Sequence, residues 1–176
     1  MSVRPLSLGT AIRLRDAALT APAELSVHRE TPPGYHRLRH RDLVPSFDRA
    51  AAALMTWRMH TGAGLRVRAS GPQAREGSVV AIGLGAGPAR LWMPCRVTDV
   101  VDEPGRAGFT YATLPGHLES GVEEFGVERT EAGAAWCTIT AVSKPGSWIT
   151  ALAGPAARLG QDFFARRYLR ALMHAS

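Results

Sequence analysis

Residues 108–125 read GFTYATLPGHLESGVEEF, and the strands and the turn predicted in this stretch indicate the fold class of the chain. Residues 109–114 predict a strand, the Pro115-Gly116 pair breaks it, and residues 122–130 predict the next strand. Residues 131–133 have the composition of a hairpin turn, and residues 134–142 follow as a further strand. The centre of the chain is therefore predicted to be an antiparallel sheet.

Upstream of this centre, the spacing of apolar residues indicates four more strands. Residues 65–69 alternate apolar side chains with arginines, which is typical of a half-exposed strand. Residues 35–41 read as an edge strand and residues 78–84 as an apolar strand. In residues 89–101, Pro94 should kink the strand or mark an edge.

Two helices complete the pattern. Ser46 is placed to cap a helix that ends at the Thr-Gly-Ala-Gly of residues 61–64. A long C-terminal helix begins near Gly154-Pro155, and its predicted apolar stripe is Ala156, Leu159, Phe163, Leu169 and Leu172. We predict an α+β fold in which a curved antiparallel sheet of six or seven strands wraps the C-terminal helix. Residues 1–30 are expected to be an N-terminal extension, and residues 31–176 a single domain.

Length, charge and cysteines bound the class of protein. A chain of 176 residues can bury one core, and its net charge of +6 invites the idea of nucleic-acid binding. The acids gather in residues 99–131, which breaks up the basic surface, so we expect no nucleic-acid partner. We also expect no membrane span and no secretory leader. Cys95 and Cys137 fit buried thiols in a reducing compartment, which favours a cytoplasmic protein.

The polar residues around the Pro-Gly break form the predicted site. His117 lies near Glu119 and Glu123 in the sequence, and a carboxylate can orient a histidine and raise its basicity. These three are the candidate catalytic residues, with Tyr111 and Thr113 as further polar contacts. The alternative is ordinary loop chemistry, in which Leu-Pro-Gly and Ser-Gly make turns and the histidine forms a structural hydrogen bond.

Metal and cofactor motifs are missing from the sequence. The six histidines are scattered, and the glycines of residues 83–88 precede a proline and a strand rather than a helix, so we expect neither metal nor cofactor. Four tryptophans are too many for exposed positions in a chain of this length. Most of Trp57, Trp92, Trp136 and Trp148 should lie in the core or line an apolar pocket, and we take Trp57 and Trp136 as the candidate pocket residues.

The chain resembles the family of unknown function DUF1990 over residues 30–172. The matching segments are GFTYATLPGHLESGVEEF, SKPGSW at residues 143–148, LAGP at 152–155 and QDFFARRYLRAL at 161–172. The sequence departs from the family pattern at Ala112, Leu118 and Val122, the last of which replaces an acid. If that acid were essential, this chain has lost it.

The resemblance implies a fold similar in element order to the helix-grip, Bet v 1-like superfamily, with a cavity between sheet and helix. It therefore implies a small hydrophobic ligand, contacted by Tyr111, Thr113, His117, Glu119 and the two tryptophans. Two alternatives stay open. One is an enzyme, such as a cyclase, isomerase or hydrolase, that uses His117 as acid or base. The other is a structural or partner-binding protein, for instance a homodimer that pairs acidic and basic segments.

Overall fold

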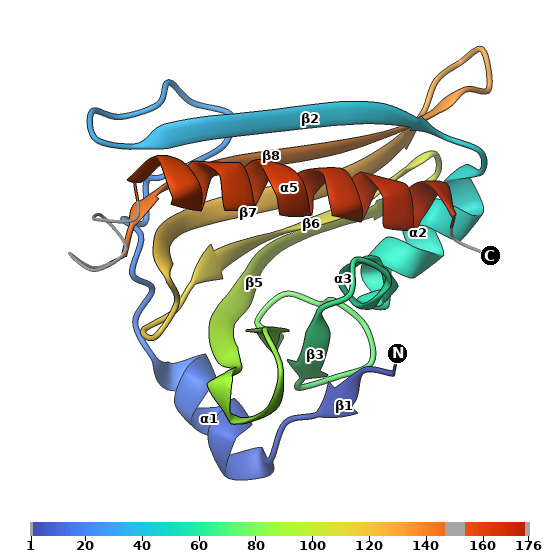
Figure 1. Ribbon diagram of the computed structural model, residues 1–176. Helices are drawn as coiled ribbons and strands as arrows, with labels where there is room; N and C mark the ends of the chain where they lie inside the picture. The colour runs from blue at the N-terminus through green and yellow to red at the C-terminus, as the bar shows by residue number, and fades with distance from the viewer. Residues whose placement is uncertain (1, 147–153, 175–176) are drawn as a thin grey trace.

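A curved sheet with a helix laid across one face forms the body of the molecule (Figure 1). The structure is a computed structural model that describes residues 2–146 and 154–174, with side chains of the last helix described from residue 159. Eight strands pair in the order β1-β3-β4-β5-β6-β7-β8-β2. The strands are β1 Arg4–Pro5, β2 His36–Val44, β3 Arg66–Ala69, β4 Val79–Leu84, β5 Leu91–Glu103, β6 Arg106–Thr113, β7 Glu119–Arg129 and β8 Ala135–Pro145. The helices are α1 Leu8–Asp16, α2 Phe47–Met55, α3 Arg58–Gly62, the 3-10 turn η1 Gly87–Ala89 and α5 Gly154–Met173.

The α+β class and the wrapped C-terminal helix are confirmed, and the seven predicted strands correspond to β2 through β8. The eighth strand is β1, two residues long, which pairs in parallel with β3. The N-terminal residues therefore contribute to the sheet, although no pattern in the sequence predicts a strand there. The predicted edge strand is also confirmed, because β2 pairs only with β8 among the described strands.

Pro94 lies inside β5, opposite Ala81 of β4, and the register shift of β5 falls later, between Val97 and Asp99. The pairing of β5 with β6 begins only at Cys95, and the Pro94 carbonyl accepts a hydrogen bond from the Leu114 amide at 3.0 Å. Pro94 has no N–H with which to return this bond, and the pairing of β5 with β6 ends at this point.

The first predicted helix is divided in two. Ser46 caps α2 as expected, since its hydroxyl accepts from the Arg49 amide at 3.4 Å. Thr56 ends this helix, and Trp57 adopts a left-handed conformation with φ 63° before α3 begins. This turn buries the indole completely and lets its Nε1 donate to the Gly71 carbonyl at 3.2 Å. Burial of the indole thus decides where the chain turns, which the helical spacing could not reveal.

The predicted apolar stripe of α5 is wrong for its first half. Leu159 is 71% exposed and Phe163 is 52% exposed, while the side chain of Ala156 lies outside the described residues. The buried positions are Ala165, Tyr168, Leu169 and Leu172. The buried residues form one stripe with Gln161 and Phe164 at helical spacing. The inward face of α5 therefore includes polar side chains, which a prediction from apolar residues alone does not include.

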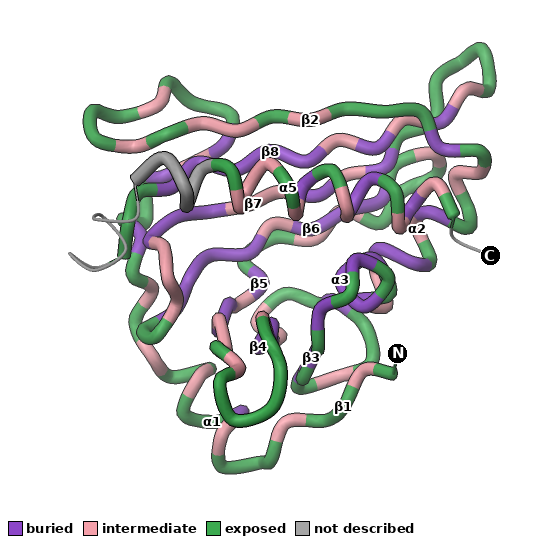
Figure 2. Tube along the Cα trace, viewed as in Figure 1, coloured by how far each residue is buried: buried purple, intermediate pink, exposed green. Residues whose placement is uncertain are grey.

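Much of the central strands is buried (Figure 2), because the main core covers the concave face and a smaller cluster covers part of the convex face. The main core lies between the sheet, α2, α3 and the C-terminal half of α5. A second cluster on the opposite face packs Ala21, Leu25 and Val27 of the N-terminal segment against Ala112, Val122 and Val142. Among the described residues, no helix is both long and apolar enough to cross a membrane.

Candidate ligand cavity

A cavity of about 430 Å³ lies between α5 and the concave face of the sheet. It is bounded by residues from β2, β4 through β8 and α5. Its volume falls within the range of natural small-molecule pockets. Most of its wall is aliphatic or aromatic, and examples are Leu38, Leu65, Ile82, Met93 and Phe164. The cavity therefore provides a largely apolar surface with a few polar groups.

Tyr111 and Glu123 form the central polar pair of the cavity. They stand opposite each other in the register of β6 and β7, and the Tyr111 hydroxyl donates to Glu123 Oε2 at 2.7 Å. Burial raises the pKa of Glu123 to about 7, partly offset by this hydrogen bond, and the nearby Glu119 raises it further. Glu123 therefore changes charge near neutral pH.

Glu119 lies at the start of β7, on the same face as Glu123. Its Oε2 accepts from Gln161 Nε2 of α5 at 2.6 Å, and the same amide nitrogen lies 3.0 Å from Ser143 Oγ of β8. Burial raises the pKa of Glu119, while hydrogen bonds from Ser143 and Gln161 act in the opposite direction. These contacts connect the helix to the sheet at the edge of the cavity.

His117 is placed by the Pro-Gly break, where Gly116 takes φ 98°. Its Nδ1 lies 3.0 Å from the Glu119 amide nitrogen, which can only donate, so the neutral ring carries its proton on Nε2. Burial lowers the pKa of His117 to about 4, and the Glu119 carbonyl, 3.2 Å from Nδ1, acts against this because it can accept from the protonated ring. In the part of the chain that is described, the His117 ring makes no hydrogen bond to a carboxylate. The predicted histidine–carboxylate dyad is therefore wrong, and His117 stabilises the turn instead.

Thr113 borders the cavity, but its hydroxyl already has partners. Its Oγ1 accepts from the Gly121 amide at 2.9 Å and lies 2.6 Å from the Thr20 hydroxyl. Thr20 also receives a bond from Ser120, whose hydroxyl donates to the Thr20 carbonyl at 2.8 Å. Thr113 thus anchors the N-terminal segment to the sheet.

The two tryptophans predicted to line the pocket do not line it. Trp57 is fully buried in the main core, and Trp136 is absent from the cavity wall. Trp136 lies on the opposite face of β8, where the Arg41 guanidinium stacks over its ring at 4.4 Å. Alternation along the strand explains this, because the neighbours Cys137 and Ile139 occupy the concave side. Trp148 lies outside the described residues.

The sequence reasoning missed Gln161 and Tyr168 of α5, which both line the cavity. Gln161, Phe164 and Tyr168 are spaced three and four residues apart, so they lie on one helix face. This spacing is the sequence feature that could have predicted them. It also missed His60, whose fully buried ring lies 5.1 Å from the Tyr168 ring and 5.5 Å from the Phe125 ring, centre to centre. Neither nitrogen of His60 has a hydrogen-bond partner among the described residues, and burial lowers its pKa to about 3.

Val122 stands where the family pattern has an acid. Its side chain packs with Ala21, Ala112 and Val142 on the face opposite Glu123. An acid at this position would sit on the convex side, beside Glu124, which pairs with His28 at 2.7 Å. The loss of that acid therefore leaves the polar pair in the cavity intact.

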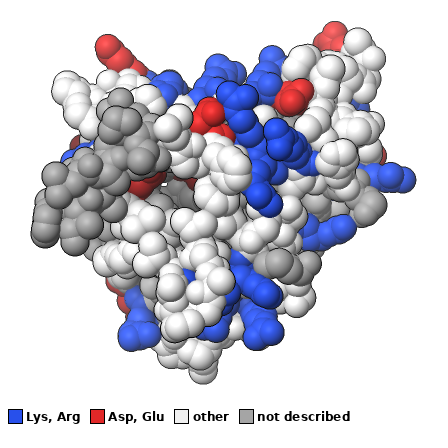
Figure 3. All heavy atoms as spheres, in the orientation of Figure 1, with Lys and Arg blue, Asp and Glu red and all other residues white. Residues whose placement is uncertain are grey.

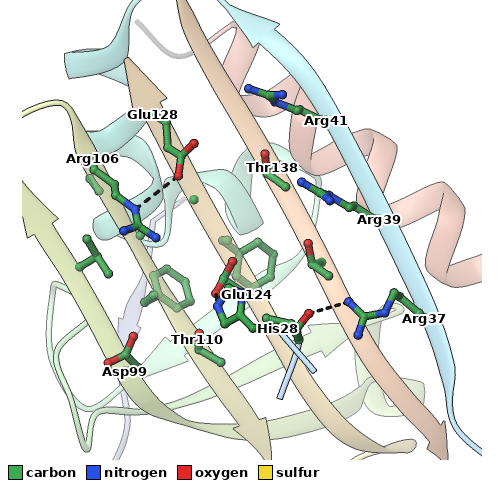
Figure 4. A pocket seen from close by; sticks show the side chains of 18 residues that line it. His28, Arg37, Arg39, Arg41, Asp99, Arg106, Thr110, Glu124, Glu128 and Thr138 are labelled. Carbon is green, nitrogen blue, oxygen red and sulfur yellow. Dashed lines mark hydrogen bonds and ion pairs between the residues drawn. The ribbon is translucent and has the colours of Figure 1, made fainter. Parts of the chain in front are cut away.

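A second, polar groove of about 270 Å³ crosses the convex face (Figure 4). Arg37, Arg39 and Arg41 extend over it from β2, facing Glu124 and Glu128 of β7. Arg37 is used structurally, because its Nη1 donates to the Val27 carbonyl at 2.5 Å. The groove thus has charges of both signs, as a solvated sheet face does.

The described residues contain neither a candidate metal site nor a disulfide bond. No group of three or more His, Cys, Asp or Glu side chains among them could hold a metal ion. Cys95 and Cys137 are buried and free, as expected, and their strands β5 and β8 are not neighbours. Basic side chains gather on the outer surface over α5 (Figure 3), whereas the acids Glu119 and Glu123 face inward.

Solved structures with similar folds come from bacteria and plants. A hypothetical protein of Helicobacter pylori aligns with a TM-score of 0.64 at 8% identity, covering 90% of this chain and 100% of that one. The major latex-like protein 151 of Panax ginseng aligns with a TM-score of 0.57 at 16% identity, covering 81% and 98%. The Mll3558 protein of Rhizobium loti gives 0.56 at 18% identity, covering 81% and 97%. At these identities the likeness shows the fold alone, which is the Bet v 1-like helix grip.

Sequence relatives carry family names without an assigned activity. A UPF0548 protein of Deinococcus radiodurans is 37% identical over 153 residues, which is 81% of this chain and 77% of the relative. A UPF0548 protein of Arabidopsis thaliana is 37% identical over 70 residues, covering 40% and 34%. The model of the domain of unknown function DUF1990 matches residues 20–171. The chain therefore belongs to the DUF1990 family.

Proposed function

We propose that the protein binds a small hydrophobic molecule in the cavity beneath α5. The observation that carries the proposal is an apolar cavity of about 430 Å³ between the helix and the concave sheet. A well-packed domain leaves few hollows larger than a water molecule, and a hollow of this size with an apolar wall is typical of a small-molecule pocket. Burial of an apolar ligand surface in such a space supplies binding free energy.

Titration with the neutral dye Nile red tests the proposal, together with a variant that fills the cavity. Ala141 lines the cavity from β8, so Ala141→Leu should weaken dye binding at least tenfold. The control is Thr140→Val, on the next residue of the strand, which lines the convex groove. Equal dye binding by the wild type and both variants would contradict the proposal.

An acid–base enzyme acting on an apolar substrate is the second candidate, and it now rests on Glu123. A carboxyl group whose pKa lies near 7 inside a cavity suits proton transfer at neutral pH. Under this alternative, Glu123→Gln would abolish turnover of a bound substrate while the substrate still binds. Turnover that is unchanged in this variant would exclude Glu123 as the acid or base.

Partner binding through the acidic segment has less support. The acids of residues 99–131 do not share one face, because Glu119 and Glu123 lie in the cavity, whereas Asp99 lies in the convex groove together with the outer pair Glu124 and Glu128. The outer pair already contact His28 at 2.7 Å and Arg106 at 3.3 Å. The groove acids also lie among arginines, so their surface carries both signs of charge and is a poor match for a basic partner.

A further inference from the structure

The cavity contains acceptor groups but lacks a basic side chain in the described part of its wall. Glu119 and Glu123 lie in that wall, and none of its described residues is Lys or Arg. His117 is neutral there, with its Nδ1 used by the Glu119 amide. A fatty acid or another carboxylate would meet two acids and no counter-ion, which disfavours it strongly.

Two polar atoms on this wall have no hydrogen-bond partner among the described residues. Tyr111 occupies only Oε2 of Glu123, and no described residue hydrogen-bonds to Oε1. Tyr168 is 6% exposed and lines the cavity, and its hydroxyl has no hydrogen bond to a described residue. Polar groups on a cavity wall that lack such a bond are available to hydrogen-bond with an occupant.

The geometry points to a hydrophobic amine as the ligand class, with its ammonium group at Glu123 and Tyr168 and its apolar body along the aliphatic wall. An ammonium nitrogen offers up to three N–H donors, and Glu123 Oε1 and the Tyr168 hydroxyl oxygen can accept two of them. Glu119 adds negative charge nearby. This inference rests on the proposed ligand binding and specifies its chemistry.

Titratable groups from several elements lie close enough to Glu123 to interact with its charge. They are Tyr111 of β6, Glu119 and Glu123 of β7, Cys95 of β5 and Tyr168 of α5. The thiol and both phenols stay neutral, because burial raises the pKa of each one. Glu123 is therefore the group whose charge changes around neutral pH, and a bound cation would favour its ionised form.

Calorimetric titration with octylamine, octanol and octanoate tests the inference, because the three probes share one chain length and differ in head group. At pH 8 we expect octylamine to bind at least tenfold more tightly than octanol, and octanoate to bind most weakly. Between pH 8 and pH 5.5 the octylamine affinity should fall, as Glu123 takes up a proton, while octanol affinity changes little.

A matched pair of variants locates the effect. In Glu123→Gln the affinity for octylamine should fall by about tenfold, so that the preference over octanol disappears, while octanol affinity stays unchanged. Glu124→Gln, on the next residue of β7 but on the convex face, should keep the preference. Octanol or octanoate binding as tightly as octylamine, or an unchanged preference in Glu123→Gln, would overturn the amine inference while ligand binding stands. Failure of all three probes to bind would instead contradict the proposed function itself.

Discussion

Tyr111 and Glu123 face each other across β6 and β7, and the phenol donates a 2.7 Å hydrogen bond to the carboxyl group inside an apolar cavity. The pairing register fixes this contact, because the two residues are direct cross-strand partners. A carboxyl group in such a place costs stability whenever it is ionised. The fold keeps it nevertheless, which is the strongest sign that the cavity has a chemical role.

Glu123→Gln should stabilise the protein at high pH. The folded pKa of Glu123 is raised from 4.5 to about 7, so the native state holds a proton that the unfolded chain releases. Below pH 4.5 the Glu123 carboxyl is protonated in both states and does not lower the free energy of unfolding. As pH rises from 4.5 to 7, the free energy of unfolding of the wild type decreases. The variant should gain up to about 3 kcal/mol over the wild type at pH 8. Urea unfolding at pH 4.5 and pH 8 measures this, and a constant difference would refute it.

Tyr111→Phe should raise the pKa of Glu123 further, because it removes the hydrogen bond that stabilises the ionised form. The expected loss of stability is about 1.5–3 kcal/mol at pH 8, where the acceptor is charged, and smaller at pH 5. Carbon NMR of the Glu123 carboxyl group gives the pKa directly. A pKa that does not move would mean that the phenol is not its partner in solution.

Gly121 of β7 should not tolerate a side chain. A Cβ there would lie 2.4 Å from the Val142 carbonyl oxygen and 2.5 Å from Ser143 Cβ. Gly121→Ala should therefore cost several kcal/mol, at the upper end of the usual range of about 0.5–3 kcal/mol. Gly126→Ala, five positions along the same strand with nothing within 4 Å of its Cβ, is the matched control and should cost little. Similar thermal unfolding of the two variants would contradict this packing.

His60 should make the protein sensitive to acid. Its folded pKa of about 3 lies below the ordinary 6.5, so the unfolded chain binds the proton first. The stability present above pH 6.5 is lost as pH falls toward 3, by up to about 5 kcal/mol. His60→Leu should flatten this dependence, and at pH 7 it should be as stable as the wild type, since no ring nitrogen loses a partner. If the stability of the wild type and of His60→Leu fell equally with decreasing pH, His60 would not be the source of the acid sensitivity.

The sequence predicted the strands well because residues such as Val67 and Ala69 alternate clearly between exposed and buried positions. It predicted Tyr111, Glu119 and Glu123 in one place because strand alternation and the Pro-Gly break were both readable. It failed where tertiary packing decides, as at Trp57, whose indole is drawn into the core by a left-handed turn.

The polar contacts of α5 could not be predicted from the sequence, because they too depend on tertiary packing. An apolar count places Leu159 and Phe163 inward, whereas the helix turns Gln161 and Tyr168 toward the cavity. Which face of an amphipathic helix is buried depends on the surface opposite it, and here that surface contains Glu119 and Ser143. Only the assembled sheet reveals that these acceptors need a donor from the helix.

Native mass spectrometry of the protein purified from its own host tests the central claim most directly. We expect a mass above that of the polypeptide, released by organic extraction and absent from Ala141→Leu prepared in the same way. The extracted compound should be small and apolar. A wild-type protein that emerges at its bare polypeptide mass, and that takes up neither Nile red nor any of the three eight-carbon probes, would contradict the claim that this cavity is a ligand site.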